Sequence, residues 1–227
     1  MDISSSLLPK LPSKASTNLG AIQWRDDPAR AQRKSEDELT SQLCRKLNSL
    51  ARRAVGWDNL HFERETPDEL SPNRNIDIAV VPLDVISVES RSYDIYDNLL
   101  MIECKRLPTP KSSKRDPREY LYSKKSSTGG VQRFKAGHHA RDHQRAFMIG
   151  YIQKDGIEHW QNQLDSWVTS ITADGVANWS DADRLTLKSQ DNVTCVACLH
   201  SSHERAAGLP PILVDHLWIE MFRNTGT

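Results

Sequence analysis

The stretch Asn98-Leu-Leu-Met-Ile-Glu-Cys-Lys-Arg106 decides the fold expected for this chain. Its four consecutive apolar residues, Leu99 to Ile102, predict a strand that is buried on both faces of a sheet. Residues two apart on a strand point to the same side, so Glu103 and Lys105 leave the end of this strand side by side. A carboxylate and an ammonium at the edge of a core are costly unless they pair or bind something. We therefore interpret this strand end as a candidate functional site.

A second apolar strand with one acid lies upstream, in Asn75-Ile-Asp-Ile-Ala-Val-Val81. An acidic residue in the middle of such a run is unusual, which makes Asp77 informative. If the two strands are neighbours in one sheet, Asp77 and Glu103 converge with Lys105 beside them.

Two acids and a lysine at one place suit the hydrolysis of phosphodiester bonds. A hard divalent cation takes oxygen ligands, usually one or two carboxylates, waters and a substrate phosphate oxygen. Such a cation polarises the phosphoryl group and lowers the pKa of bound water. A neighbouring lysine can position or deprotonate the attacking water and offset charge in the transition state.

The pattern Asp77…Glu103-x-Lys105 resembles that of the PD-(D/E)XK nuclease superfamily, also called restriction-endonuclease-like. The resemblance implies that Asp77 and Glu103 bind a metal, Mg²⁺ or Mn²⁺, and that Lys105 is the catalytic lysine. Ile76 stands where the superfamily pattern has a proline, which the chemistry does not require. The resemblance covers roughly residues 35 to 152.

The expected fold is α/β, with a restriction-endonuclease-like αβββαβ core and a mixed central sheet. This core occupies about residues 35–152, and a C-terminal strand and helix extension occupies 153–227. Residues 1–28 are rich in Ser, Lys and Pro and predict an irregular N-terminal arm. Residues 29–227 are expected to form a single nuclease-like domain.

The first helix is expected to begin at Ser35, which forms a plausible capping box with Glu38. An apolar stripe of leucines follows at helical spacing, and Glu36 extends this stripe backward. Superfamily members often carry an acid on the first helix facing the metal, so Glu36 is a fourth candidate catalytic residue. The alternative is that the acids of this first turn only favour the positive end of the helix.

The remaining elements follow from shorter patterns in the chain. We expect a polar strand or hairpin excursion between Leu83 and Asp97, and a helix introduced by Gly129-Gly130. Further strands are expected at 61–65, 146–152, 193–199 and 212–219, with an amphipathic helix at 157–171. The tryptophans of that helix are most simply interpreted as core residues.

The segment from Lys105 to Arg145 is strongly basic, with twelve Lys or Arg against three Asp or Glu. A basic loop that leaves the active-site strand is well placed to hold a phosphate backbone. The candidate nucleic-acid contacts are Lys124, Lys125, Arg133 and Lys135. The alternative is a solvated loop without a ligand.

Two groups of potential zinc ligands do not predict a zinc site. His138, His139 and His143 lack an acid that completes a site, and Cys195, Cys198, His200 and His203 are poorly spaced for a tetrahedron. His203 and Arg205 are expected in a loop after a strand, where they could approach substrate.

Global composition excludes some classes of protein. Lys plus Arg and Asp plus Glu both number 30, so the formal net charge is zero and identifies no partner. No apolar run approaches the roughly 18 residues of a membrane span, and no signal pattern opens the chain. The four cysteines fit reduced thiols better than a disulfide framework. We therefore expect a cytoplasmic protein without a membrane association.

The expected function is that of a metal-dependent endonuclease in restriction, phage defence or repair, with DNA favoured over RNA. A homodimer and a subunit of a larger defence complex are both compatible with this function. The alternative is a nuclease-fold module for nucleic-acid binding or assembly, with little or no cleavage. The chain contains no Gly-x-Ser-x-Gly motif, which argues against a serine hydrolase.

Overall fold

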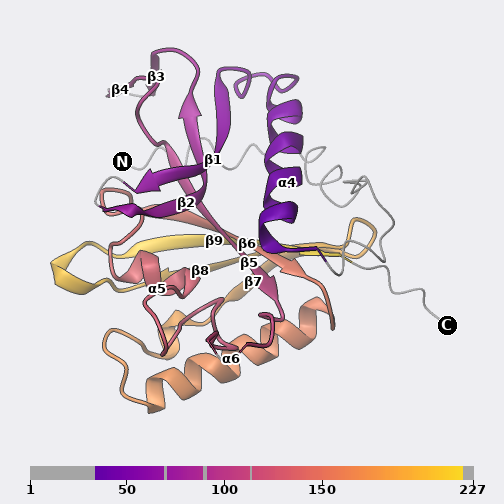
Figure 1. The fold of residues 1–227 in the computed structure, drawn as a ribbon, viewed down its shortest axis with the longest axis vertical. Helices are drawn as coiled ribbons and strands as arrows, with labels where there is room; N and C mark the ends of the chain where they lie inside the picture. The colour runs from indigo at the N-terminus through magenta and orange to yellow at the C-terminus, as the bar shows by residue number, and fades with distance from the viewer. Residues whose placement is uncertain (1–33, 69–70, 89–90, 113, 222–227) are drawn as a thin grey trace.

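The computed structural model describes residues 34–68, 71–88, 91–112 and 114–221. The N-terminal arm expected over residues 1–28 lies outside the described residues. Within them the chain forms a seven-stranded sheet in the order β1-β2-β5-β6-β9-β8-β7 (Figure 1). The bounds of these strands are β1 Leu60–Asp68, β2 Ser71–Pro82, β5 Leu100–Leu107, β6 Arg145–Ile152, β7 Thr186–Asp191, β8 Val196–His203 and β9 Ile212–Glu220.

The sheet is mixed, as the sequence predicts. β1, β2 and β5 pair antiparallel, β5, β6 and β9 pair parallel, and β9, β8 and β7 again pair antiparallel. The excursion between β2 and β5 is a hairpin of β3 (Ile86–Val88) and β4 (Arg91–Tyr93). This hairpin lies at the end of the molecule opposite α6 (Figure 1). It therefore leaves β2 and β5 free to meet.

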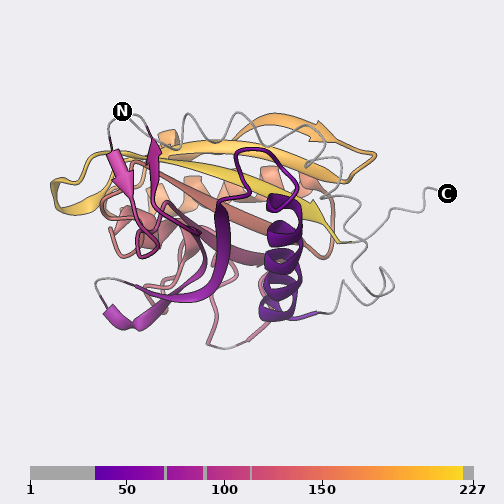
Figure 2. The same ribbon diagram turned by 90° about the horizontal axis from the view of Figure 1, so that it is seen from above.

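Helix α4 (Glu36–Ala51) covers one face of the sheet and lies beside β1 (Figure 2). Its capping box is formed as predicted, with Ser35 Oγ accepting the Glu38 N–H and the Glu38 carboxylate accepting the Ser35 N–H. Leu39 and Leu43 are fully buried, and they lie on the same face of the helix as Glu36. The sequence pattern therefore predicted both the start of this helix and its buried side.

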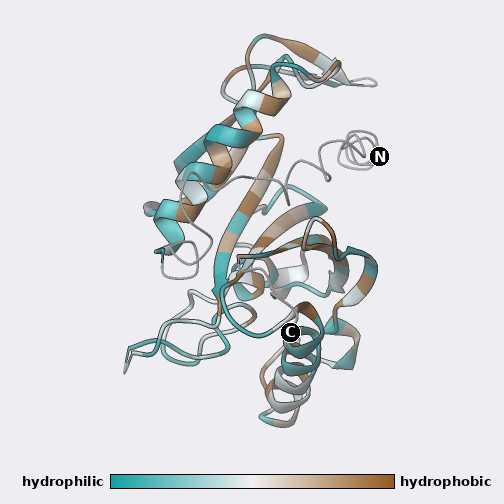
Figure 3. Cartoon of the chain, turned by 90° about the vertical axis from the view of Figure 1, so that its right-hand side faces the viewer, coloured by the Kyte–Doolittle hydropathy of each residue, from teal (hydrophilic) through white to brown (hydrophobic). Residues whose placement is uncertain are grey.

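The short helix α5 (Gly130–Lys135) and the longer α6 (Ile157–Ala173) cover the opposite face. Alternate residues of β6 enter the two cores, Met148 on the side of α6 and Ile149 on the side of α4. Figure 3 shows the strands between α4 and α6. Trp160 and Leu164 of α6 are buried core residues, as expected from their spacing.

The C-terminal region continues the same sheet but differs from the expected strands. β7 was not predicted, because all six of its residues are exposed and carry no apolar pattern. The expected strand at 193–199 begins only at Val196, because Asp191 Oδ1 accepts the N–H groups of Val193 and Thr194 and forms a turn. The positive φ of 56° at Cys195 belongs to this turn.

No helix in the described part of the chain is both long and apolar enough to cross a membrane. None of the four cysteines forms a disulfide within the described residues; Cys44 and Cys104 are buried, whereas Cys195 and Cys198 are partly exposed.

Candidate active site

The sheet separates at the position where the site forms. Regular pairing of β2 with β5 ends at Ile78 and Ile102, one residue before Asp77 and Glu103. Asp77 Oδ2 accepts the backbone N–H of Cys104 at 2.7 Å, so a side-chain carboxylate bonds to β5 where the regular pairing stops. Because this bond fixes the orientation of Asp77, its carboxylate faces the end of β5.

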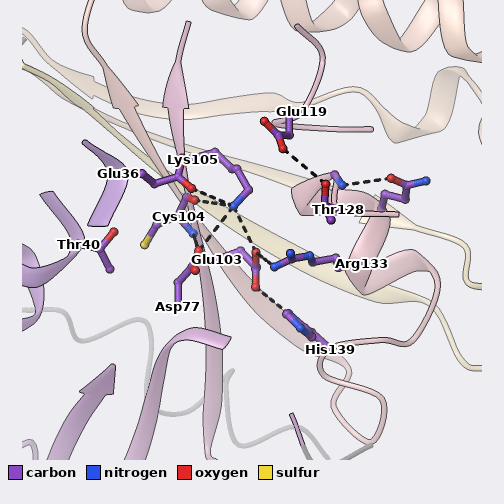
Figure 4. Close-up of polar contacts among 12 residues, drawn as sticks. Glu36, Thr40, Asp77, Glu103, Cys104, Lys105, Glu119, Thr128, Arg133 and His139 are labelled. Carbon is purple, nitrogen blue, oxygen red and sulfur yellow. Dashed lines mark hydrogen bonds and ion pairs between the residues drawn. The ribbon is translucent and has the colours of Figure 1, made fainter. Parts of the chain in front are cut away.

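The Lys105 ammonium joins three carboxylates that come from three different elements (Figure 4). Its Nζ lies 3.3 Å from Glu36 Oε1 on α4, 3.7 Å from Asp77 Oδ2 on β2 and 3.6 Å from Glu103 Oε2 on β5. It also donates to the Cys104 carbonyl at 2.9 Å. The structure thus brings together the four residues that the sequence singled out for catalysis. We call Glu36, Asp77, Glu103 and Lys105 the acidic cluster.

Glu36 belongs to the acidic cluster, whereas its neighbour Glu38 caps the helix. Glu36 Oε2 accepts the backbone N–H of Arg106 at 3.0 Å, and its Oε1 faces Lys105. Of the two interpretations of the first-turn acids, the structure therefore supports a contact with the site for Glu36.

Glu103 is fully buried, and cationic or imidazole groups lie against both of its oxygens. Arg133 Nη1 on α5 donates to Oε2 at 2.9 Å, and His139 Nδ1 lies 2.7 Å from Oε1. His139 Nε2 is in turn 3.5 Å from Asp68 Oδ2. His139 and Asp68 were not predicted for this site: the only sequence signal of His139 is its place in the group of three histidines, and Asp68 has none.

The charges of the site shift the pKa values of its members in opposite directions. Burial acts to raise the pKa of Glu103, but Lys105, His139 and Arg133 outweigh it and lower the pKa to about 2. Burial acts to lower the pKa of Lys105, but the carboxylates of Asp77, Glu36 and Glu103 outweigh it, so this pKa is raised. Lys105 is therefore an ammonium at neutral pH.

Asp77 is the destabilised carboxylate of the site. Burial, followed by the negative charge of Glu103, raises the pKa of Asp77 to about 6, against smaller opposing effects of Lys105 and the Cys104 N–H. Its side chain is nevertheless 28% exposed, so solvent reaches it. No partner of Oδ1 is recorded within the described residues. Asp77 thus offers an accessible, poorly neutralised oxygen.

The donors of the site fit a cation that takes few protein ligands. No group of three or more His, Cys, Asp or Glu residues that could hold a metal ion occurs in the described ranges. Mg²⁺ is usually held by one or two carboxylates with waters and substrate phosphates. Asp77, with its accessible oxygen, and Glu103 meet that smaller requirement.

Among the predicted nucleic-acid contacts, Lys135 is a correction. Its side chain is 4% exposed, forms an ion pair with Asp183 and lies 4.7 Å from the centre of the Trp179 ring. The short helix α5 turns this residue into the core, which the basic composition of the segment concealed. Lys124 and Lys125 are exposed, and Arg133 reaches the acidic cluster.

Lys125 borders a shallow hollow beyond the end of β5, which we call the basic hollow. Its lining residues are Thr109, Pro110, Lys111, Ser112, Arg115, Pro117 and Lys125. Arg115 is paired with Glu119 at 2.6 Å, and Lys125 Nζ donates to the Arg115 carbonyl at 3.3 Å. The first residue of the hollow, Thr109, follows Lys105 by four positions.

We expect the double variant Lys111→Gln/Lys125→Gln to bind nucleic acid about tenfold more weakly at low salt. The slope of log affinity against log salt should fall by about two, since each phosphate contact releases roughly one counterion. Fluorescence anisotropy over a salt series measures both quantities. Arg53→Gln/Lys188→Gln, which removes the same charge at exposed positions in the turn after α4 and on β7, is the control. Equal affinities and slopes for both double variants would show that the hollow is only a solvated surface.

A buried polar network ties α5 to the C-terminal strands. Asp183, which pairs with Lys135, lies 2.5 Å from His203 Nδ1, and Ser201 Oγ joins His203 Nε2 and His216 Nε2 at 2.6 and 2.7 Å. His216 Nδ1 forms a hydrogen bond with the Tyr120 hydroxyl at 2.9 Å.

The two residues expected in a loop near substrate have structural positions instead. His203 lies within β8 and is fully buried in the polar network. Arg205 is 5% exposed and donates to the carbonyls of Ala140 and Pro210 at 2.9 and 2.6 Å. His203 is not in a loop because β8 extends to it, whereas Arg205 follows β8 as expected but is buried by its contacts with these carbonyls.

We expect this polar network to lower the free energy of unfolding as the pH falls. Burial lowers the pKa of His203, against the opposing effect of Asp183, and burial with His203 and His200 lowers that of His216 well below its usual range. A depressed histidine pKa means that stability is present above the ordinary pKa and is lost as pH falls, because only the unfolded chain takes up the proton. The free energy of unfolding of wild type relative to His216→Gln should fall by on the order of 2 kcal/mol between pH 6.5 and 5. Urea unfolding measures this difference, in which the effects of titrating groups outside the network cancel; parallel pH profiles would contradict it.

The fold and the site together define an α/β protein whose mixed sheet carries a lysine among three carboxylates at a strand end. Comparisons of the chain with protein-family models, with curated proteins and with solved structures gave no match. The functional argument therefore starts from the contacts of the acidic cluster.

Proposed function

We propose that this chain is a metal-dependent nuclease that hydrolyses phosphodiester bonds of nucleic acid, with DNA as the favoured substrate. The observation that carries the proposal is the Lys105 ammonium within 4 Å of carboxylates from α4, β2 and β5. An ion pair needs one carboxylate, and three around one lysine leave excess negative charge that a divalent cation can neutralise.

The order of the elements supports a restriction-endonuclease-like core. α4, β1, β2, β5, α5 and β6 follow one another as αβββαβ, with the β3–β4 hairpin inserted. β6 lies parallel beside β5, and the strands with Asp77 and Glu103 are neighbours. This is the order that the resemblance of Asp77…Glu103-x-Lys105 to the PD-(D/E)XK superfamily implies.

In this proposal Asp77 and Glu103 hold the metal, Mg²⁺ or Mn²⁺, which supplies Lewis-acid activation of the phosphoryl group and of a bound water. Lys105 keeps its proton in the metal-free site, so it acts as a fixed charge and hydrogen-bond donor beside the attacking water. Glu36 holds Lys105 at 3.3 Å and joins the end of β5 through the Arg106 N–H at 3.0 Å. We therefore assign Glu36 a positioning role.

The test is incubation of the protein with labelled single- and double-stranded DNA and RNA, with Mg²⁺, with Mn²⁺ and with EDTA. We expect cleavage of at least one substrate, DNA first, that requires the divalent cation. Cleavage that persists in EDTA would show that the reaction does not require a divalent cation. Absence of cleavage on all four substrates would contradict the proposal that the chain is a nuclease.

One observation favours a second candidate, a nuclease-fold binding or assembly module without cleavage. Glu103 is fully buried and already contacted by Arg133 and His139, so its charge is neutralised without a metal. A protein that binds nucleic acid or a protein partner tightly but cuts none of the four substrates would support this module.

A further inference from the structure

Arg133 occupies the oxygen of Glu103 that faces the acidic cluster. Its Nη1 donates to Glu103 Oε2 at 2.9 Å, and the same oxygen lies 3.6 Å from Lys105 Nζ. The other oxygen, Oε1, faces His139 on the opposite side. A cation shared between Asp77 and Glu103 would therefore meet the oxygen that Arg133 holds.

A divalent cation and a guanidinium on one carboxylate oxygen repel each other strongly. Two like charges a few ångströms apart in a largely buried site repel each other, and the double charge of a divalent ion doubles this repulsion. Metal binding at Glu103 thus competes with the contact of Arg133. One of the two must be displaced for the other to bind fully.

The two neighbours of Glu103 differ in exposure and in their other contacts. The Arg133 side chain is 17% exposed, and its contact with Glu103 uses only Nη1. No contact of Nε or Nη2 is recorded within the described residues, so these donors are available to a ligand. His139, by contrast, has a fully buried side chain and is backed by Asp68 at 3.5 Å. Glu103 therefore keeps its orientation through His139 when Arg133 leaves.

We propose that Arg133 is a phosphate-binding residue that is held on Glu103 in the free protein and is transferred to a substrate phosphate when a divalent cation takes Glu103 Oε2. This inference rests on the proposed nuclease function and adds the residue that couples metal binding to substrate binding. The planar guanidinium suits a phosphate because it can donate two parallel hydrogen bonds. The transfer also avoids leaving an unpaired guanidinium beside the metal.

The test is a pair of affinities that should move in opposite directions in Arg133→Gln. Without nucleic acid, we expect Mn²⁺ to bind about tenfold more tightly than to wild type, because a competing charge is removed. With Ca²⁺ in place of Mg²⁺ to limit cleavage, we expect an oligonucleotide to bind about tenfold more weakly, because a phosphate contact is lost. Calorimetry and anisotropy measure the two affinities, with exposed Lys188→Gln as the charge control.

Arg133→Lys keeps the charge and separates this role from a structural one. We expect Mn²⁺ affinity within about twofold of wild type, since the competing charge remains, and intermediate oligonucleotide affinity, since the bidentate contact is lost. This variant also carries the test if Arg133→Gln fails to fold, as judged by its melting curve.

Three outcomes would overturn the inference. The first is a folded Arg133→Gln that binds Mn²⁺ no more tightly than wild type, and the second is one that binds the oligonucleotide equally well. Either would leave the nuclease proposal intact if wild type cuts nucleic acid. The third is a wild-type protein that binds no Mn²⁺, which would overturn the nuclease proposal as well.

Discussion

Replacing Lys105 by glutamine is expected to lower the cleavage rate by about 10² to 10⁴-fold, the range for losing a positioned acid–base or charge-stabilising group. Within the described residues, Lys105 is the one cation that contacts Glu36, Asp77 and Glu103 together, and its raised pKa keeps it charged. Glutamine retains a hydrogen-bond donor but not the charge that offsets the transition state. Single-turnover cleavage of a labelled oligonucleotide measures the rate.

Binding of nucleic acid by Lys105→Gln should stay within about threefold of wild type, since one buried charge makes at most one of several phosphate contacts. Lys188→Gln, on the exposed edge strand β7, should cut as fast as wild type. A rate for Lys105→Gln equal to that of wild type would show that the catalytic assignment is wrong even where the fold is right.

Replacing Asp77 by asparagine is expected to abolish cleavage and to stabilise the metal-free protein. The pKa of Asp77 is raised to about 6, so ionised Asp77 destabilises the folded state by on the order of 1–3 kcal/mol at neutral pH. Asparagine removes this charge and can still accept the Cys104 N–H through its carbonyl oxygen. Thermal unfolding should show a melting temperature several degrees higher, at about 2–4 °C per kcal/mol.

The pH dependence of this gain has a definite sign. A raised carboxyl pKa means that folded-state stability is greatest when Asp77 is protonated and is lost as pH rises through about 6. The gain in stability of Asp77→Asn should therefore be larger at pH 8 than at pH 5.

Saturating Mg²⁺ should raise the melting temperature of wild type but not of the variant. The exposed Asp84→Asn is the control. A gain that is equal at both pH values, or a variant less stable than wild type at pH 8, would contradict the origin assigned to the pKa of Asp77.

The sequence was informative where a polar residue interrupts an apolar period. Asp77 and Glu103-x-Lys105 stand out because each breaks a buried strand, and Glu36 because it extends a leucine stripe. Periodicity also located α4, β2, β5, β6 and α6 to within a few residues. These elements suffice to bring the acidic cluster together.

The remaining features depend on contacts between distant segments, which local patterns do not reveal. Lys135 looks like a surface lysine in its basic segment, and only its contact with Asp183, 48 residues away, places it in the core. The contacts of His139 with Glu103 and Asp68 likewise need the folded sheet. β7 was missed because an exposed edge strand has no apolar face to detect.

The location of bound Mn²⁺ tests most directly whether Asp77 and Glu103 hold a metal beside Lys105. Anomalous diffraction from crystals grown with Mn²⁺ measures this position. We predict a peak about 2.0–2.6 Å from an oxygen of each of Asp77 and Glu103, the range for hard cations on carboxylates, with Arg133 displaced from Glu103. A peak elsewhere, or none at saturating Mn²⁺ with Arg133 still on Glu103, would contradict the assignment of Asp77 and Glu103 as metal ligands.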